Sequence, residues 1–202
     1  MTSDPDGGTV FLFDFDGTIT ATELLPVIAA EVGLAREIGE LTAATMAGEV
    51  LFDASFRRRV DLLAEVPVAR VAEIVTEMPV LEQLVKWIKS RRSECWIVTS
   101  NLDCWVRPWL DRHGLEGFTS RSNMRSGRVA VEHILRKESV LRRFPGRRTV
   151  MVGDGANDAE LISEATVGIA NAIVHDVPPV VLEVADYLVM DEGTLCRTLS
   201  RL

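Results

Sequence analysis

Polar side chains that suit phosphate or metal chemistry stand at three places in the sequence, each directly after an apolar run. They are Asp14 and Asp16 in FLFDFDGTIT, Thr99 and Ser100 after ECWIV, and Asp154, Asn157 and Asp158 in GDGAND. A single Asp-x-Asp-Gly also suits a surface turn, because Asp and Gly both favour turns. The repetition of polar groups at the ends of apolar runs favours a shared site over three unrelated turns.

The acidic residues in these groups predict a site for a hard divalent cation. Carboxylates that converge repel one another, and burying them without a partner is costly. Mg2+ prefers oxygen ligands, usually keeps several waters and often takes a substrate phosphate as a further ligand. We therefore expect Mg2+ as the cofactor and a phosphorylated compound as the substrate.

An aspartate carboxylate can also attack phosphorus and form an aspartyl-phosphate, which replaces one difficult displacement by two easier ones. Phosphoryl transfer otherwise depends on positioning and on neutralising charge. Lys137, predicted at the start of the helix KESVLRRF, would add a fixed ammonium to the same crevice. These residue types predict phosphoryl transfer, with Lys137, Thr99 and Mg2+ positioning the phosphate and neutralising its charge.

The elements that must position these residues follow a strand and helix alternation. Runs rich in β-forming residues occur at 9–14, 94–99, 117–120, 148–153, 166–170 and 186–190. The first, second and fourth are almost continuously apolar, which is typical of strands inside parallel sheets. Helical spacing lies between them, as in Leu81, Leu84, Val85 and Ile88. The pattern predicts an α/β fold with a Rossmann-like, doubly wound parallel sheet, in which ligands bind beyond the carboxyl ends of the strands.

An insertion separates the first two predicted strands. Roughly 70 residues lie between them, whereas a crossover connection needs only a dozen or so. The stretch has helical patterns broken by Pro and Gly. We expect a small helical cap domain at 22–78, and a core domain formed by 1–21 and 79–202. A hairpin turning at Ser126 and Gly127 is expected within the core.

Composition limits the possible partners. The chain has 202 residues, a 47% hydrophobic content and a formal charge of -8, which argues against a nucleic acid or an anionic membrane as the main partner. An anionic substrate would need local positive charge. The three cysteines lack C-x-x-C spacing, so we expect reduced thiols and a cytoplasmic protein. The sequence is compatible with a monomer or a homodimer.

DFDGT, a strand ending in Thr99, Lys137 and GDGAND, in this order, resemble the four motifs of the haloacid dehalogenase superfamily. The resemblance covers nearly the entire chain. It implies that Asp14 is the nucleophile and Asp16 the general acid and base. It also implies a set of phosphate and metal ligands: Thr99, Ser100, Lys137 and Asn157 for phosphate, and Asp14, the backbone carbonyl of Asp16, Asp154 and Asp158 for the metal site. The presence of Asp16 favours phosphate-ester hydrolysis over dehalogenation.

The insertion resembles the phosphoserine phosphatase branch of that superfamily. Glu23 stands nine residues after Asp14, and TMAGEVLFDASFRRRVDLL places Met46, Phe52 and Arg59 at intervals similar to those of that branch. The resemblance implies that Arg59 binds a carboxylate, Glu23 faces an ammonium, and Met46 and Phe52 shield them. Arg is well shaped for bidentate carboxylate binding. The Arg run also suits a solvated helix face, and Met46 and Phe52 suit plain cap core.

One departure leaves the substrate open. The branch usually carries Ser-Gly-Gly after the second strand, whereas this chain has Thr99-Ser100-Asn101, so Ser100 and Asn101 should reshape that wall. The following Leu102-Asp103 looks similar to relatives that act on enol phosphates of methionine salvage. We expect a phosphatase with L-phosphoserine as the leading substrate. Enol phosphates, sugar phosphates, other biosynthetic intermediates and transfer to an alcohol are the alternatives.

A binding module without catalysis is disfavoured, because it would not need both a nucleophile and a proton shuttle. Other conspicuous residues suit structural roles. Trp105 and Trp109 share a helix face and are expected in the core. His113, His133 and His175 show no metal-ligand spacing, so none is placed in the site.

Overall fold

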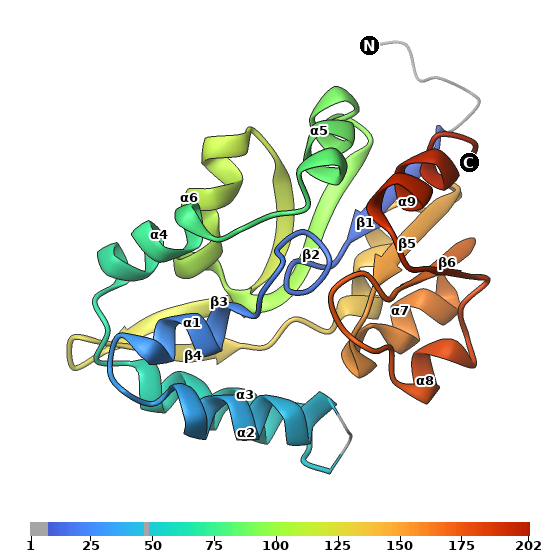
Figure 1. Cartoon of the computed structure of the whole chain (residues 1–202). Coiled ribbons are helices and arrows are strands. Elements are labelled where there is room, and N and C mark those ends of the chain that lie inside the picture. Colours follow the sequence, from blue (N-terminus) through green and yellow to red (C-terminus); the bar gives the residue numbers. More distant parts are fainter. Residues whose placement is uncertain (1–7, 47–48) are drawn as a thin grey trace.

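The structure is a computed structural model that describes residues 8–46 and 49–202 (Figure 1). These residues form a seven-stranded sheet in the order β4-β3-β2-β1-β5-β6-β7. Neighbouring strands are parallel except for the antiparallel pair of β3 and β4. The strands are β1 (Val10–Phe13), β2 (Cys95–Leu102), β3 (Glu116–Arg125), β4 (Arg128–His133), β5 (Thr149–Gly153), β6 (Val167–Asn171) and β7 (Tyr187–Val189). The doubly wound α/β class predicted from the sequence is confirmed.

Strand β1 lies at the centre of the sheet and is buried on both faces. Phe11 and Phe13 belong to one hydrophobic cluster, and Val10 and Leu12 belong to a second. Successive side chains of a strand point to opposite faces, so a strand covered on both sides must be apolar throughout. Parallel pairing of β1 with β2 and β5 then brings the carboxyl ends of these three strands together.

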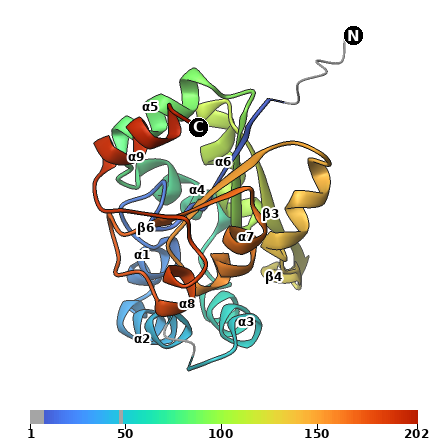
Figure 2. The same cartoon turned by 90° about the vertical axis from the view of Figure 1, so that its right-hand side faces the viewer.

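Helices cover the two faces of the sheet. Figures 1 and 2 both place α9 beside α5 and α8 beside α7, and contacts between these helices agree. The first cluster includes residues of α5, α6 and α9, and the second includes residues of η1, α7 and α8. These elements are α5 (Glu82–Ser90), α6 (Asp103–His113), the 3-10 helices η1 (Lys137–Arg143) and η2 (Ala156–Asp158), α7 (Ala159–Glu164), α8 (Pro179–Leu182) and α9 (Glu192–Leu199). Lys137 therefore begins a helix, as predicted, but a 3-10 helix.

The insertion between β1 and β2 is helical. It contains α1 (Leu24–Ala30), α2 (Ala35–Met46), α3 (Phe52–Leu63) and α4 (Val68–Glu77). Two segments connect the insertion to the sheet. They meet at Thr20 and Val80, which form an antiparallel bridge close to the predicted boundaries. However, α4 packs against α6, and one hydrophobic cluster runs through both parts. The division into a cap of 22–78 and a core of 1–21 and 79–202 stays a prediction.

The β3–β4 hairpin extends the sheet beneath the insertion. Its turn is formed by Ser126 and Gly127, whose φ angles are 51° and 78°. Two consecutive positive φ angles are typical of the tight turn that matches strand twist, so the predicted hairpin is confirmed. Helix α3 packs against β4, and the Arg57 guanidinium donates a hydrogen bond to the carbonyl of Val131 at 3.1 Å. The hairpin and the insertion are therefore in direct contact.

The predicted core roles of two tryptophans are confirmed, since Trp105 and Trp109 are each 1% exposed. Trp109 contacts the ring of Phe15 edge-on, with ring centroids 5.1 Å apart. Cys95, Cys104 and Cys196 are free thiols. In the described ranges, none of the helices combines the length and apolar character that crossing a membrane would require.

Candidate active site

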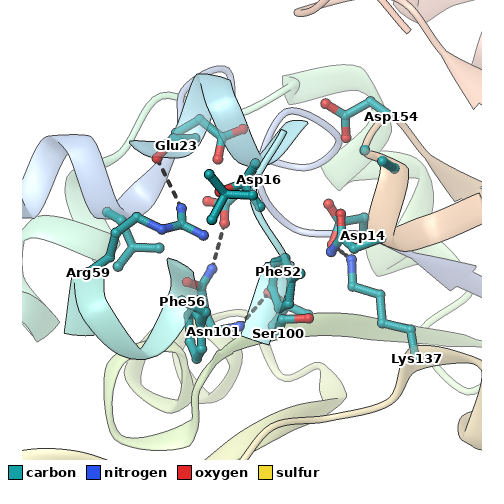
Figure 3. Close-up of a pocket in the computed structure, with 18 of the residues that line it drawn as sticks. Asp14, Asp16, Glu23, Phe52, Phe56, Arg59, Ser100, Asn101, Lys137 and Asp154 are labelled. Atoms are coloured by element: carbon teal, nitrogen blue, oxygen red, sulfur yellow. Dashed lines mark hydrogen bonds and ion pairs between the residues drawn. The ribbon is translucent and has the colours of Figure 1, made fainter. Parts of the chain in front are cut away.

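A cavity of about 300 Å³ lies between the carboxyl ends of β1, β2 and β5 and the helices α2 and α3. Figure 3 shows its acidic residues, Lys137 and Arg59 pointing into it. With one exception, all the site residues predicted from the sequence either line this cavity or lie beside it. The lining includes Asp14, Asp16, Glu23, Phe52, Arg59, Thr99, Ser100, Lys137, Asp154 and Asn157. Met46 is the exception, because its side chain lies outside the described residues.

Asp14 and Lys137 meet at the bottom of the cavity. Asp14 directly follows β1 and is 7% exposed, while Lys137 is 3% exposed. The Lys137 Nζ donates to Asp14 Oδ1 at 2.5 Å and to Asp158 Oδ1 at 2.6 Å. Burial alone would lower the pKa of Lys137, but the charges of Asp14 and Asp158 outweigh it and raise that pKa. Lys137 is therefore a permanent cation between two buried carboxylates.

The carboxylates outnumber this ammonium. Oxygen atoms of Asp14, Asp154 and Asp158 all lie within 4.8 Å of one another. Burial raises the pKa of Asp14 and of Asp154 well above the usual value of 3.8, and the charge of Asp158 raises both further. Three buried carboxylates with one ammonium leave negative charge uncompensated. The donor set fits a hard divalent cation, which takes carboxylate oxygens.

Gly17 lets the loop after β1 approach this carboxylate group. Its φ is +67°, and a Cβ at this position would overlap the Asp154 carboxylate and lie 2.7 Å from His175 Cδ2. The next residue, Thr18, donates from Oγ1 to Asp154 Oδ1 at 3.2 Å. In DFDGT, the Gly therefore allows a left-handed backbone where a side chain would not fit, and the Thr supplies a hydrogen-bond donor for Asp154.

Asp16, two residues after Asp14, also lines the cavity. Its Oδ1 accepts a hydrogen bond from the Leu24 backbone N–H at 2.9 Å, and its Oδ2 accepts one from Asn101 Nδ2 at 2.6 Å. Burial, and then the charge of Glu23, raise the pKa of Asp16 to about 7. A carboxyl with this pKa can both give and take a proton near neutral pH.

The insertion contributes Arg59 from α3. Arg59 is 3% exposed, whereas Arg57 and Arg58 are exposed, so the structure singles out the residue that was predicted to line the site. Its Nη1 donates to Thr42 Oγ1 at 3.0 Å. Burial lowers the pKa of Arg59, and the charges of Glu23 and Asp16 oppose that shift. A guanidinium side chain thus lies buried between the insertion and the acidic loop.

Apolar and hydroxyl side chains complete the walls. Phe52 stacks on Phe56, with ring centroids 5.7 Å apart and an interplanar angle of 9°. Thr99 and Ser100, in the second half of β2, are 2% and 7% exposed. Asn157, from η2, lies at the exposed rim. The cavity therefore has a polar floor suited to phosphate and an aromatic wall on the side of the insertion.

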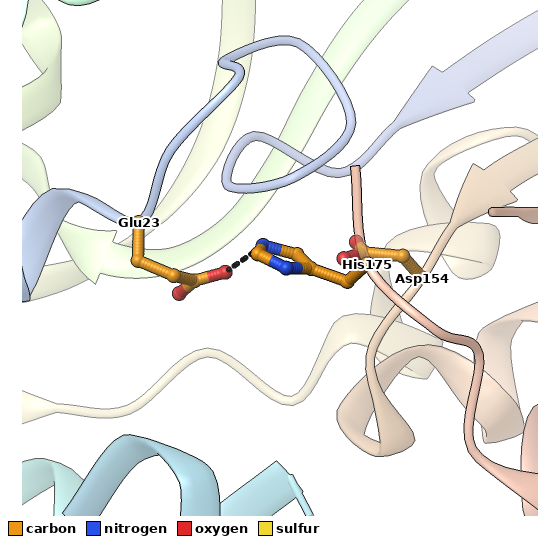
Figure 4. A group of neighbouring side chains, drawn as sticks. All are labelled: Glu23, Asp154 and His175. Carbon is orange, nitrogen blue, oxygen red and sulfur yellow. Dashed lines mark ion pairs between the residues drawn. The ribbon is translucent and has the colours of Figure 1, made fainter. Parts of the chain in front are cut away.

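Three features of the site have no signal in the sequence. Phe56 lines the cavity one helical turn after Phe52, and Asn101 contacts Asp16. His175, which the sequence leaves out of the site, is not among the residues that line the cavity, but it contacts Glu23, which does line it. Its Nε2 lies 3.2 Å from Glu23 Oε1, and this contact raises the pKa of His175 (Figure 4). His175 comes from the loop after β6, and no spacing in the sequence signals its approach to Glu23.

Comparisons with known proteins place the chain among hydrolases. The haloacid dehalogenase-like hydrolase family matches residues 9–166. Phosphoserine phosphatase of Methanocaldococcus jannaschii is 30% identical over 177 residues, which are 80% of this chain and 84% of that protein. Phosphoserine phosphatase SerB2 of Mycobacterium tuberculosis is 30% identical over 88% of this chain, but the match spans only 46% of that longer protein.

Two solved structures that are similar to this chain are also of phosphoserine phosphatases. A substrate-bound phosphoserine phosphatase complex has a TM-score of 0.80 and 27% identity, covering 99% of this chain and 100% of that one. A phospho-aspartyl intermediate analogue of phosphoserine phosphatase has a TM-score of 0.78 and 26% identity, covering 95% of this chain and 99% of that one.

Proposed function

The chain belongs to the haloacid dehalogenase-like hydrolase family, and from this premise we propose that it hydrolyses a small phosphate monoester through a phosphoryl group carried on Asp14. It is a phosphatase of the phosphoserine phosphatase-like branch, and L-phosphoserine is the leading substrate. The observation that carries the mechanism is the placement of Asp14 beside Lys137 and Asp16 in one cavity. The cavity holds a nucleophile, a fixed cation and a proton donor together.

In the first half-reaction, the Asp14 carboxylate attacks phosphorus and the bond from phosphorus to the ester oxygen breaks. Asp14 Oδ1 is held by Lys137, which leaves Oδ2 for the attack. Asp16 donates its proton to the departing oxygen, so the product alcohol leaves neutral. Lys137, Thr99 and Ser100 would hold the phosphoryl oxygens and stabilise their charge, with Asn157 at the rim.

In the second half-reaction, Asp16 takes a proton from water, and that water attacks phosphorus and releases Asp14 and inorganic phosphate. Asp14, Asp154 and the backbone carbonyl of Asp16 would hold Mg2+, with Asp158 steadying the site. The ion, when bound, supplies neutralising charge for these carboxylates and the phosphate. Water as the acceptor, in place of an alcohol, belongs to the proposal.

Arg59 and Glu23 support the choice of L-phosphoserine. The buried guanidinium would bind the substrate carboxylate, Glu23 would face the substrate ammonium, and Phe52 would cover both. The proposed substrate is a small molecule, and a cavity of about 300 Å³ has room for it. The cytoplasmic location and the monomer or homodimer state predicted from the sequence stay predictions.

A second candidate is a phosphatase for a small metabolite that lacks the ammonium group, such as an enol phosphate or a sugar phosphate. His175 favours it, because this side chain already places a cation-forming group 3.2 Å from Glu23. A Glu23 carboxylate paired with His175 has less charge to offer a substrate ammonium.

A phosphate-release assay tests both candidates. The purified chain is incubated with Mg2+ and a panel of phosphorylated amino acids, enol phosphates and sugar phosphates, and Asp14→Asn serves as the matched control. We expect release from L-phosphoserine to exceed release from the other esters, and the control to release nothing. Preference for an ester without an amine would select the second candidate. Activity retained by Asp14→Asn would contradict the covalent mechanism.

A further inference from the structure

Asn101 makes the shortest hydrogen bond that Asp16 receives. Its Nδ2 lies 2.6 Å from Asp16 Oδ2, and its own side chain lies in the cavity wall (Figure 3). The residue is 3% exposed, and its backbone N–H donates to Thr99 Oγ1 at 3.1 Å. Strand β2 therefore fixes the position of the amide, and the amide faces the carboxyl that the proposed mechanism uses to move protons.

The two oxygens of Asp16 are held from opposite sides. The Leu24 backbone N–H, at the start of α1, binds Oδ1, while Asn101 binds Oδ2 from the sheet. Hydrogen bonds to a carboxylate are shorter and stronger than those between neutral groups. Each oxygen of a carboxylate has two lone pairs, so each keeps one free for a transferred proton. Two donors on separate elements fix the plane of the carboxyl without occupying the lone pairs that carry the proton.

We propose that Asn101 is a positioning residue, which orients the Asp16 carboxyl toward the ester oxygen of the substrate. This inference rests on the proposed phosphatase function. In the step concerned, the bond from phosphorus to the ester oxygen breaks, and the Asp16 proton moves to that oxygen as its electron pair is released. Alkyl phosphates need this proton because an alkoxide is a poor leaving group, whereas p-nitrophenolate leaves without one. Asn101 therefore accelerates the cleavage of alkyl phosphates selectively.

A purely structural role for Asn101 would produce a different pattern. Loss of a buried hydrogen bond that only stabilises the loop would slow all substrates alike, because it would disturb the same cavity for each of them. The ratio of kcat/KM for an alkyl phosphate to kcat/KM for p-nitrophenyl phosphate separates the two roles. This quantity reports the first half-reaction, so the later attack of water does not affect it.

The test compares Asn101→Leu, which keeps the branched shape and removes the donor, with the unmodified chain. Asn101→Gly is the second variant if the leucine disturbs folding, and circular dichroism checks the fold of both. Ser122→Ala is the matched control, because it removes a hydrogen bond to Asp103 near the same strand but outside the cavity. The substrates are the best alkyl phosphate of the screen and p-nitrophenyl phosphate, both with Mg2+.

We expect either Asn101 variant to lose roughly tenfold or more in kcat/KM for the alkyl phosphate, the size of one lost charge-assisted hydrogen bond. The loss for p-nitrophenyl phosphate should stay within about twofold, and Ser122→Ala should leave the ratio unchanged. Equal losses on both esters, or no loss in a folded variant, would overturn the positioning role while leaving the proposed function intact. Failure of the unmodified chain to hydrolyse any ester would overturn both.

Discussion

Asp154→Asn should stabilise the protein when Mg2+ is removed. Asp154 is 2% exposed, and its carboxylate oxygens lie within 4.8 Å of oxygens of Asp14 and Asp158. Asparagine has almost the same shape and keeps an oxygen that can accept the hydrogen bond from Thr18. The substitution therefore removes a negative charge and little else. It should also remove Mg2+-dependent activity.

The size of the effect follows from Coulomb's law. Two like charges 4.8 Å apart repel by about 3.5 kcal/mol at an effective dielectric constant of ~20. Asp154 faces two such charges, Lys137 offsets part of the repulsion, and protonation of a carboxyl limits the remainder. We expect a net gain of about 2 kcal/mol in the free energy of unfolding, or roughly 4–8 °C in Tm for a domain of this size.

The pH dependence of the free energy of unfolding provides a second check that Asp154→Asn is stabilising. Burial raises the pKa of Asp14 and Asp154 above 3.8, so the folded chain retains protons that the unfolded chain has lost. The stability linked to these groups is present below pH 4 and is lost as pH rises through the raised values. The advantage of Asp154→Asn should therefore vanish near pH 4 and grow toward pH 8.

The difference in Tm between Asp154→Asn and the parent is measured by thermal unfolding, followed by circular dichroism in excess chelator at pH 4, 6 and 8. Asp61→Asn is the control, because Asp61 is exposed on α3 and its loss changes the net charge equally. Added Mg2+ should raise the Tm of the parent at pH 8 and leave that of Asp154→Asn nearly unchanged. If Asp154→Asn melts at or below the parent at pH 8 in chelator, the carboxylates do not repel, and the physical argument for a metal there is lost.

Three further substitutions probe the same site. Gly17→Ala should cost at least about 1 kcal/mol more than Gly33→Ala in urea unfolding, because both glycines have positive φ but only the first would press a Cβ against Asp154. Lys137→Met should lower the free energy of unfolding by about 3–5 kcal/mol near neutral pH and abolish turnover, because it leaves two buried carboxylates without their ammonium. A smaller loss of stability in chelator than with Mg2+ would contradict this explanation. Arg59→Met should raise KM for a carboxylate-bearing ester at least about tenfold more than KM for p-nitrophenyl phosphate, while the exposed Arg58→Met changes neither; equal effects would show that Arg59 does not bind a carboxylate.

The sheet and its carboxyl edge could be predicted because burial leaves few choices. Strand β1 pairs with β2 and β5 in a parallel register, with Phe13 opposite both Ile97 and Val152. Residues just beyond these positions, Asp14 and Thr99 among them, must then lie together. Continuous apolar runs mark such strands in the sequence, so the polar residues that end them mark the site.

The contacts of Asn101 and His175 had no such signal. Each depends on the direction of a side chain or the path of a loop, and neither follows from the period of a strand or a helix. The sequence marks Asn101 only as a departure that should reshape a wall, because its contact with Asp16 depends on how the two side chains meet in the folded chain. Phe56 was missed because one turn of α3 presents two aromatic rings to the cavity, and the resemblance pointed to Phe52 alone.

The charge balance of the cavity explains how a chain with a net charge of -8 can bind an anion. The cavity wall gathers two buried fixed cations, Lys137 and Arg59, at the two ends where a substrate phosphate and a substrate carboxylate would lie. The acidic residues around them would repel the same substrate unless a divalent cation were present. Net charge describes the outer field of the protein, whereas recognition of a small anion depends on the few charges that water no longer screens. The acidic overall composition therefore does not oppose a phosphate site in this cavity.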